Sequence, residues 1–400
     1  MIDKVWFRNY KLLRSVELDL ERLTVLVGPN ASGKSTVLEG IQLVQRAMEH
    51  MGSNSIDKEG EQNVLRVSRT PIAVPPPNYP LSETIPLIPI KQDILNPDYA
   101  VMMTQDLPIL VMGFQGRFNH EPTEAEFRLE SNRNRQGLDL VLRNWKRGST
   151  HLTYATNDIL RDLNQLILAL KHRPDRLAAP ARSDQLTPRM REDGTGLAAV
   201  LAELKLNDSD IFDRIQERLK AVIPQVEKIR VQRATLPDSS GISGPTQPEF
   251  GYEVVLDLKG APRIPAHALS DGTLLTLGLL TVLSLDFQTD RIVLIDDIGA
   301  EMHPRAIQEQ LVQLRALLDL DPGLQIVATT HSPYLLDHLK PEEVYMTTLD
   351  DDGYTLLARM NEHPDFERWK EVMAPGEFWS SVGEDWIKKR PLGTGGHQDG

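Results

Sequence analysis

Short runs of apolar residues recur along the chain, and each leads into a stretch with the spacing of a helix. Short runs made mostly of apolar residues are typical of strands buried on both faces, and they occur at 23–27, 292–295 and 325–328. Helices are predicted at 37–48, from an apolar stripe, and at 274–285. This alternation favours an α/β fold with a largely parallel sheet, which binds ligands at the carboxyl ends of its strands.

Other segments do not fit a parallel sheet. Apolar segments separated by turn residues predict antiparallel strands at 2–7, 16–20, 108–117, 124–131, 138–144 and 151–155. A helical block is expected next, with helices at 158–171, 197–206 and 211–223. Prolines crowd the segment 52–100, so we expect a long surface loop there. A second loop is expected at 234–250, which is rich in Pro, Ser and Gly.

The composition excludes several kinds of chemistry. The 400 residues include no cysteine, so disulfides, thiolate zinc sites and cysteine nucleophiles are excluded. The first residues lack the basic start and apolar core of a signal peptide. The most apolar stretch, 274–285, is interrupted by threonines and is too short to span a bilayer. We therefore expect a soluble, cytoplasmic protein without a membrane partner.

Charge is distributed unevenly along the chain. The formal net charge of −13 disfavours a globally basic nucleic-acid binder. Residues 128–233 nevertheless hold 20 Lys and Arg against 14 Asp and Glu, a net charge of +6. Two interpretations stay open for this part: a surface that contacts DNA, or a solvated helical face of mixed charge.

The segment Gly28–Thr36 fits the pattern Gly-x-x-x-x-Gly-Lys-Ser/Thr and lies between a predicted strand and a predicted helix. Backbone N–H groups of such a loop surround phosphate oxygens at a helix N-terminus. Lys34 is then expected to neutralise the β- and γ-phosphates, and the Ser35 hydroxyl to bind Mg²⁺. The predicted nucleotide-binding residues of the loop are Asn30, Ala31, Ser32, Gly33, Lys34, Ser35 and Thr36.

Three further motifs have both a chemical and a local interpretation. Asp296 and Asp297 follow the apolar run 292–295. In the chemical interpretation, Asp296 would hold Mg²⁺ through water, and Asp297 would orient or deprotonate the attacking water. In the local interpretation, the two residues form a turn or a helix cap. Ser270 and Gly272 precede an apolar helix and suit either an N-cap or a second phosphate site. His331 follows the run 325–328 and suits either a γ-phosphate contact or a local hydrogen bond.

Together, the four motifs resemble the ABC-type ATPase heads of the RecF, SMC and OLD-like group, specifically an AAA-family ATPase without a Toprim domain. The resemblance reaches to about residue 385 and includes the segments Phe7–Leu13, Met302–Pro304 and Pro375–Trp379. It implies a P-loop NTPase of the ABC/SMC-head type, with a mostly parallel core sheet, an antiparallel subsheet and a helical insertion. The expected parts are a head lobe at 1–157, the insertion at 158–235, a second head lobe at 236–385 and a flexible tail at 386–400.

Heads of this group dimerise head to tail, with ATP held between the phosphate loop of one copy and the Leu-Ser-x-Gly signature of the other. The resemblance thus implies that Ser270 and Gly272 act in trans, that Asp296 serves Mg²⁺ and that His331 is a switch histidine. The expected function is an ATP-gated dimeric switch in DNA maintenance or anti-phage defence. The expected partners are a second copy or a higher oligomer, a nuclease-type protein, and DNA along residues 128–233.

The chain departs from the family pattern in ways that keep alternatives open. Asp297 stands where the family usually has Glu, so turnover is expected to be slow unless Glu301 assists. An ATP-binding scaffold with little hydrolysis is therefore one alternative. An ATP-binding subunit of a transporter is another, disfavoured because Ser270 lies 236 residues after Lys34, a larger separation than transporter heads have.

Overall fold

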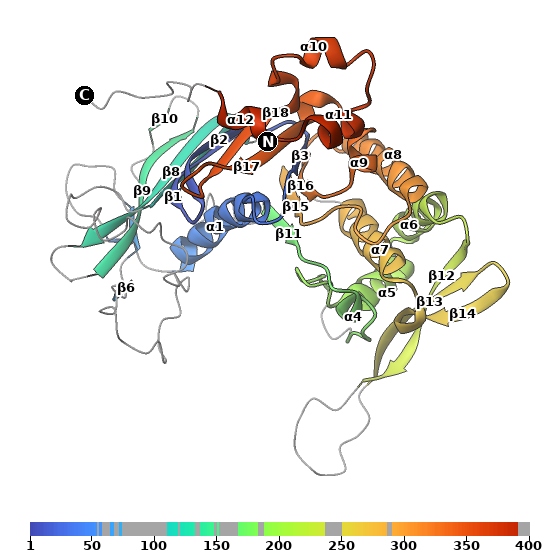
Figure 1. Ribbon diagram of the computed structural model, residues 1–400. Coiled ribbons are helices and arrows are strands. Elements are labelled where there is room, and N and C mark those ends of the chain that lie inside the picture. The colour runs from blue at the N-terminus through green and yellow to red at the C-terminus, as the bar shows by residue number, and fades with distance from the viewer. Residues whose placement is uncertain are drawn as a thin grey trace. The chain divides into compact units, whose positions relative to one another are not determined.

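The computed structural model describes residues 1–53, 56–57, 65–67, 72–73, 110–118, 121–132, 137–147, 150–151, 167–182, 188–236, 250–285 and 290–390 (Figure 1). The chain forms two compact units, each of which is described by itself. Unit 1 comprises Met1–Leu168, Thr289–Leu294 and Gly323–Gly400, and unit 2 comprises Ala169–Gln288 and Ile295–Pro322.

Among the described residues, the core sheet of unit 1 has six strands in the order β11-β15-β16-β3-β17-β18. Strand β3 (Leu23–Val27) pairs in parallel with β16 (Leu324–Thr330) and with β17 (Val344–Leu349). Strand β17 then turns back, antiparallel, into β18 (Thr355–Arg359). All residues of β3, β16 and β15 (Arg291–Ile295) are buried, which confirms the three strands predicted from mostly apolar runs.

The remaining core strand, β11 (Ile167–Leu170), corrects a prediction. The apolar stripe at 158–171 predicts a helix, but its last apolar residues form a strand beside β15. Four consecutive apolar residues suit a buried strand as well as a helix face, and periodicity alone does not separate the two. The earlier part of the predicted helix, up to residue 166, lies outside the described residues.

The second sheet of unit 1 is antiparallel, in the order β2-β1-β7-β8-β9-β5-β4, with β6 and β10 paired to β9. Its longer strands are β1 (Ile2–Tyr10), β2 (Leu13–Asp19), β7 (Leu110–Phe118), β8 (Glu121–Asn132) and β9 (Gly137–Arg147), and they confirm the predicted antiparallel strands up to residue 144. The strand predicted at 151–155 appears only as β10 (Thr150–His151), and the rest lies outside the described residues.

The proline-rich segment 52–100 contributes three short strands, β4 (Ile56–Asp57), β5 (Leu65–Val67) and β6 (Ile72–Ala73). Strands β5 and β6 both pair with β9. Most of the expected surface loop therefore lies outside the described residues, and the described part adds to the antiparallel sheet.

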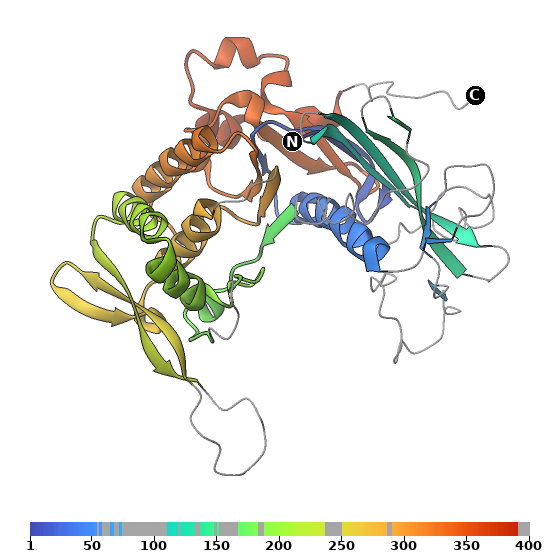
Figure 2. The same cartoon turned by 180° about the vertical axis from the view of Figure 1, so that it is seen from behind.

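Helix α1 (Lys34–Ser53) packs against both sheets of unit 1, and both views show it alongside the antiparallel strands (Figures 1 and 2). Val37, Leu38 and Ile41 are buried, as the predicted stripe requires. The helix begins at the lysine of the phosphate motif, so the core sheet and α1 together fix both ends of that loop.

Unit 2 consists of helices and one small sheet. Its helices are α4 (Pro174–Leu177), α5 (Leu197–Asn207), α6 (Ser209–Val222), α7 (Asp271–Ser284) and α8 (Pro304–Leu320). The antiparallel sheet has the order β12-β13-β14, formed by Val226–Thr235, Phe250–Leu258 and Ala261–Pro265. Unit 2 thus extends beyond the expected insertion at 158–235, because it also holds the signature helix α7 and the helix α8 that follows the acidic pair.

The C-terminal segment of unit 1 is folded up to residue 390. It contains α9 (Pro333–Leu336), η3 (Pro341–Glu343), η4 (Met360–Glu362), α10 (Phe366–Trp369), α11 (Pro375–Val382) and α12 (Asp385–Lys388). The His363 ring packs edge-on against Phe378 and Trp386, and Ile387 is buried. The flexible tail expected from residue 386 is therefore wrong for α12, while residues 391–400 lie outside the described residues.

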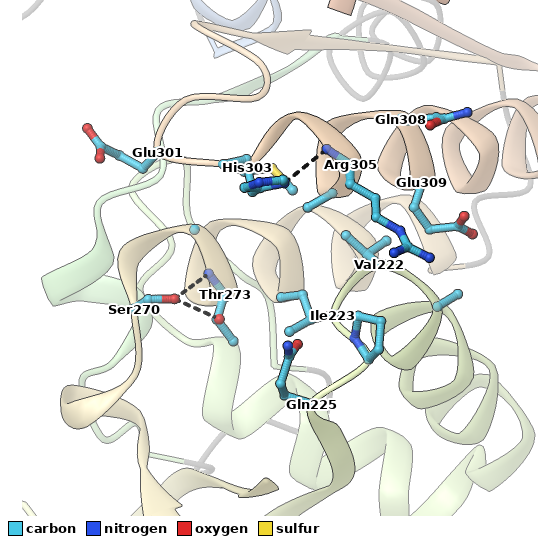
Figure 3. A pocket seen from close by; sticks show the side chains of 15 residues that line it. Val222, Ile223, Gln225, Ser270, Thr273, Glu301, His303, Arg305, Gln308 and Glu309 are labelled. Atoms are coloured by element: carbon cyan, nitrogen blue, oxygen red, sulfur yellow. Dashed lines mark hydrogen bonds between the residues drawn. The ribbon is translucent and has the colours of Figure 1, made fainter. Parts of the chain in front are cut away.

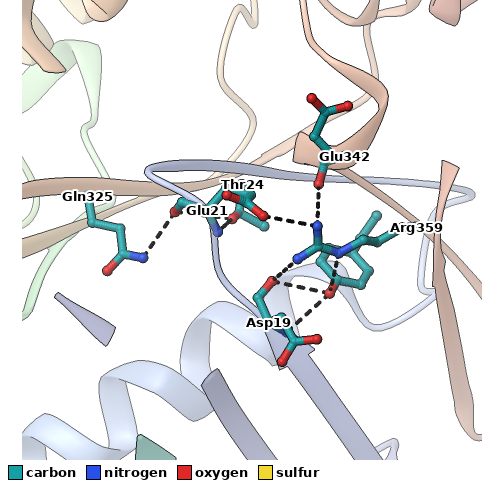
Figure 4. A network of polar contacts seen from close by, with 7 residues as sticks. Asp19, Glu21, Thr24, Gln325, Glu342 and Arg359 are labelled. Carbon is teal, nitrogen blue, oxygen red and sulfur yellow. Dashed lines mark hydrogen bonds and ion pairs between the residues drawn. The ribbon is translucent and has the colours of Figure 1, made fainter. Parts of the chain in front are cut away.

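Arg359 at the end of β18 joins several chain segments of unit 1 (Figure 4). Its guanidinium donates to the Asp19 carbonyl at 2.9 Å, the Glu21 carboxylate at 3.1 Å and the Glu342 carbonyl at 3.0 Å. It also donates to the Tyr345 hydroxyl at 3.0 Å, which in turn donates to the Asp19 carbonyl. The network fixes the chain just before β3, the strand that leads into the phosphate loop.

His172 gives unit 2 a pH-dependent stability. Burial lowers the pKa of His172 to about 4, against a partly compensating effect of Asp193, and the buried Nε2 atom has no hydrogen-bond partner among the described residues. The unfolded chain, with a histidine pKa of about 6.5, therefore binds the proton more readily than the folded chain. The contribution of His172 to the free energy of unfolding is fully present above about pH 6.5 and is lost as the pH falls toward 4.

We expect the free energy of unfolding to fall by about 2–3 kcal/mol between pH 7 and pH 4.5 from this residue alone. His172→Gln, which stays neutral, should lose correspondingly less over the same interval. Urea unfolding followed by circular dichroism at the two pH values measures the difference. Equal losses in both proteins would show that His172 is not the source.

Candidate functional site

The phosphate motif forms a tight loop between β3 and α1 in unit 1. Ala31 (φ 62°) and Gly33 (φ 96°) are left-handed, and the Ser32 N–H donates to the Pro29 carbonyl at 3.3 Å. Left-handed residues in a loop before a helix turn N–H groups toward one side, an arrangement that binds anions. The backbone therefore has the shape that the sequence motif predicts.

Lys34 lies over this loop. Its side chain is almost completely buried, and the ammonium group donates to the carbonyls of Gly28 at 2.9 Å and Pro29 at 2.7 Å. A buried ammonium needs such partners, because desolvation without hydrogen bonds is costly. Ser35, in contrast, is exposed at the first turn of α1.

His331 lies at the same edge of the core sheet as the start of the phosphate loop. The register of β3 and β16 pairs Val27 with Thr330, and the next residues are Gly28 and His331. His331 is exposed, and the chain after it is held by a hydrogen bond from the Ser332 N–H to the Thr330 hydroxyl at 3.1 Å. The structure thus places two of the predicted motifs at the carboxyl ends of neighbouring strands, where α/β sheets bind ligands.

Asp296 and Asp297 follow β15 directly and belong to unit 2. Both side chains are exposed. Asp297 has a left-handed backbone (φ 55°), and its carbonyl accepts from the Ala300 N–H at 3.2 Å in the turn that follows. A non-glycine residue in this conformation is uncommon, and such residues concentrate at functional sites.

The signature residues form the start of α7 in unit 2. Ser270 is the N-cap, as predicted: its hydroxyl accepts from the Thr273 N–H at 3.4 Å and lies 2.8 Å from the Thr273 hydroxyl. A Cβ at Gly272 would lie 2.8 Å from the Glu301 carbonyl oxygen. Only glycine therefore lets the 296–302 turn approach α7 this closely.

A cavity of about 720 Å³ opens in unit 2 beside these residues (Figure 3). Ser270, Gly272 and Thr273 line it at the start of α7, Glu301 lines it from the turn before α8, and Arg305 lines it from the first turn of α8. The structure thus brings Glu301 together with Ser270 and Gly272, whereas Asp296 and Asp297 do not line this cavity.

His303, which lies in one of the segments that carry the resemblance, also lines the cavity but has a clear local role. It is the N-cap of α8, and its Nδ1 accepts from the Arg305 N–H at 3.2 Å. Since Nδ1 accepts this bond, a neutral ring carries its proton on Nε2. The sequence alone does not point to His303 as a cap, because Ser, Thr, Asp and Asn are the residues that usually cap helices.

The two predicted metal ligands, Ser35 and Asp296, carry the oxygen atoms that Mg²⁺ prefers. Within the described ranges, no three His, Asp or Glu side chains gather as a metal-binding group. Mg²⁺ is typically held by one or two protein oxygens together with substrate phosphates. The exposed Ser35 hydroxyl and Asp296 carboxylate supply oxygen donors of that type.

Comparison with known families identifies the class of protein. Residues 112–337, more than half of the chain, match the family described as "AAA domain, putative AbiEii toxin, Type IV TA system". Residues 1–73 match the family described as "AAA ATPase domain". The chain belongs to the first of these families, and the predicted AAA-family ATPase is confirmed. ATP binding and hydrolysis are the general activities of such families.

Two solved structures of SMC heads are among those to which the chain is similar. The SMC head domain from Thermotoga maritima has 13% sequence identity and a TM-score of 0.45, over 90% of this chain and 98% of that one. The Smc head domain from Pyrococcus furiosus, with an extended coiled coil and bound to the C-terminal domain of ScpA, has 11% identity and a TM-score of 0.47. That match covers 93% of this chain and 99% of the other.

Among the helices that the structure describes, none combines the length and the apolar character that a membrane crossing requires.

Proposed function

We propose that the protein is a Mg²⁺-dependent ATPase that works as an ATP-gated dimeric switch. The observation that carries this proposal is the complete phosphate loop, with the buried Lys34 ammonium at the carbonyls of Gly28 and Pro29. Bound ATP would offer phosphate oxygens to this ammonium and to the loop N–H groups. Ser35 and Asp296 would hold Mg²⁺, which screens the charge of the phosphates.

The second half of the proposed site is the cavity at the start of α7. In the proposed dimer, Ser270 and Gly272 of one copy contact the γ-phosphate of ATP bound to the phosphate loop of the other copy. The N-terminus of a 14-residue helix favours negative charge there, and Ser270 lies at that end. The dimer would thus form with ATP and come apart after hydrolysis, because ADP lacks the group that completes the contact.

Asp297 is the proposed base for the attacking water, and Glu301 is the proposed assistant. Both residues have left-handed backbones in the same short turn. The Glu301 carbonyl contacts Gly272, so this turn and the signature belong to one packed group. His331 is proposed to contact the γ-phosphate, since it lies at the same sheet edge as the start of the phosphate loop.

The proposed biological setting is cytoplasmic DNA maintenance or anti-phage defence, with a nuclease-type partner. The resemblance to RecF- and OLD-like heads supports this setting, and the family description, which names a toxin of a TA system, is compatible with a role in defence.

DNA contact through residues 128–233 stays a prediction. Unit 1 and unit 2 share this range, and several of its cations are paired with carboxylates, among them Arg128, Arg173, Lys205, Lys220 and Arg230.

The oligomeric state tests the switch. With a nonhydrolysable ATP analogue and Mg²⁺, the 45.0 kDa chain should double its mass in light scattering, and with ADP it should not. Ser270→Arg should still bind the analogue but remain at the mass of one chain, because the long side chain fills the contact. Ser209→Arg, an exposed serine at the start of α6 in the same unit, is the control and should dimerise. Dimerisation of Ser270→Arg like the unchanged protein would refute the contact in trans.

A further inference from the structure

The hairpin formed by β17 and β18 contacts the phosphate loop through two threonines. The Thr347 hydroxyl lies 2.6 Å from the Ser32 hydroxyl and donates to the Val27 carbonyl at 3.2 Å. The Thr355 hydroxyl donates to the Ser32 carbonyl at 3.1 Å. Both threonines lie more than 300 residues after the loop, and no part of the phosphate motif includes them.

The direction of these hydrogen bonds follows from the number of protons. A hydroxyl donates once, and the proton of Thr347 goes to the Val27 carbonyl. The Ser32 hydroxyl must therefore donate to Thr347 Oγ1. Ser32 is thus held twice, through its hydroxyl by Thr347 and through its carbonyl by Thr355.

These contacts are almost completely shielded from solvent. The exposed fractions are 2% for Ser32, 0% for Thr347 and 3% for Thr355. Water cannot replace a lost partner there without rearrangement, and a buried polar group left unpaired is destabilising. The three side chains are therefore tightly coupled.

The two glycines of the phosphate motif lie against the same threonines. A Cβ added at Gly28 would collide with the Thr347 carbonyl and hydroxyl, and one added at Gly33 would collide with the Thr355 hydroxyl. The hairpin thus contacts the loop at its first residue, at Ser32 and at Gly33. In this protein, the motif glycines are needed for packing against the hairpin as well as for the shape of the loop.

We propose that Thr347 and Thr355 are positioning residues that hold the phosphate loop in its nucleotide-binding shape. This inference rests on the proposed function, because it assumes that the loop binds ATP. The left-handed Ala31 next to Ser32 costs energy that only a constraining environment sustains. The threonines supply that constraint, and without their hydroxyls the loop loses its fixed shape.

Thr347→Val and Thr355→Val test the proposal, because valine keeps the shape of threonine and removes the hydroxyl. We expect each to weaken the binding of a fluorescent ATP analogue about 10-fold. Thr347→Ser and Thr355→Ser, which keep the hydroxyl, should bind within about 2-fold of the unchanged protein. Thr348→Val is the matched control: it is buried on β17 next to Thr347, and no hydrogen bond joins it to the loop in the part of the chain described.

Hydrogen exchange provides a second measurement that needs no nucleotide. Amides of the peptide 28–36 should exchange faster in both valine variants than in the serine variants or in Thr348→Val. Unchanged binding and unchanged exchange in the valine variants would overturn the proposal. If the unchanged protein binds no ATP, the proposed function fails, and faster exchange in the valine variants would still show that the threonines hold the loop.

Equal effects in Thr348→Val would also overturn the proposal, because the changes would then report a general loss of packing in β17.

Discussion

Lys34→Ala is expected to reduce ATP binding about 100-fold and to bring hydrolysis below detection. The ammonium that neutralises the phosphates is removed, and hydrogen bonds to a charged group contribute about 1.5–3 kcal/mol each. The same change leaves the carbonyls of Gly28 and Pro29 without this donor, which further weakens the loop. Titration with a fluorescent ATP analogue and a phosphate-release assay measure the two effects.

Lys4→Ala is the matched control for this experiment. Lys4 lies in the same unit, pairs with Glu17 at 2.7 Å, is partly exposed and is not part of the phosphate motif. It should bind and hydrolyse ATP like the unchanged protein. An unaltered rate in Lys34→Ala would remove the assignment of the phosphate loop.

Asp297→Asn is expected to lower the rate of hydrolysis about 10²- to 10⁴-fold while ATP binding remains, because the amide cannot accept the proton of the attacking water. The fold should tolerate this change, since Asn adopts the left-handed backbone of Asp297 (φ 55°) readily. The variant should accumulate as a dimer with ATP itself, without a nonhydrolysable analogue. Single-turnover hydrolysis and light scattering of the same sample measure both effects.

Two comparisons make this result specific. Asp319→Asn, an exposed position near the end of α8 in unit 2, should hydrolyse ATP at the unchanged rate. Glu301→Gln should reduce the rate less than Asp297→Asn if Glu301 only assists. A full rate in Asp297→Asn together with a large loss in Glu301→Gln would move the role of base to Glu301.

The sequence predicted the elements whose structure depends on their own residues alone. The runs at 23–27, 292–295 and 325–328 are apolar nearly throughout and form strands with every residue buried. Ser270 precedes an apolar helix and caps it, because a hydroxyl at that position satisfies an N–H that the helix leaves unpaired. Local chemistry determines these features, so local patterns are enough to find them.

Features that depend on distant parts of the chain were not predicted. Ile167–Leu170 forms a strand because β15 is available as a neighbour, and nothing within the segment itself requires it. Thr347 and Thr355 are ordinary strand residues in the sequence, and their contact with Ser32 follows only from the pairing of β17 with β3. The chemical roles assigned to individual residues remain predictions. The structure adds their positions: Glu301 lies beside Gly272, and His331 follows β16 as Gly28 follows the neighbouring strand β3.

The close approach of Gly272 to the Glu301 carbonyl couples movement of the 296–302 turn to movement of helix α7. Two backbones with no room for a methyl group between them cannot shift independently, because packed interfaces behave as rigid bodies rather than as soft ones. A rearrangement of the 296–302 turn when the terminal phosphate leaves would push directly on the first turn of α7. The turn that responds to hydrolysis would then move the helix that contacts the second copy directly, with no other residues between them.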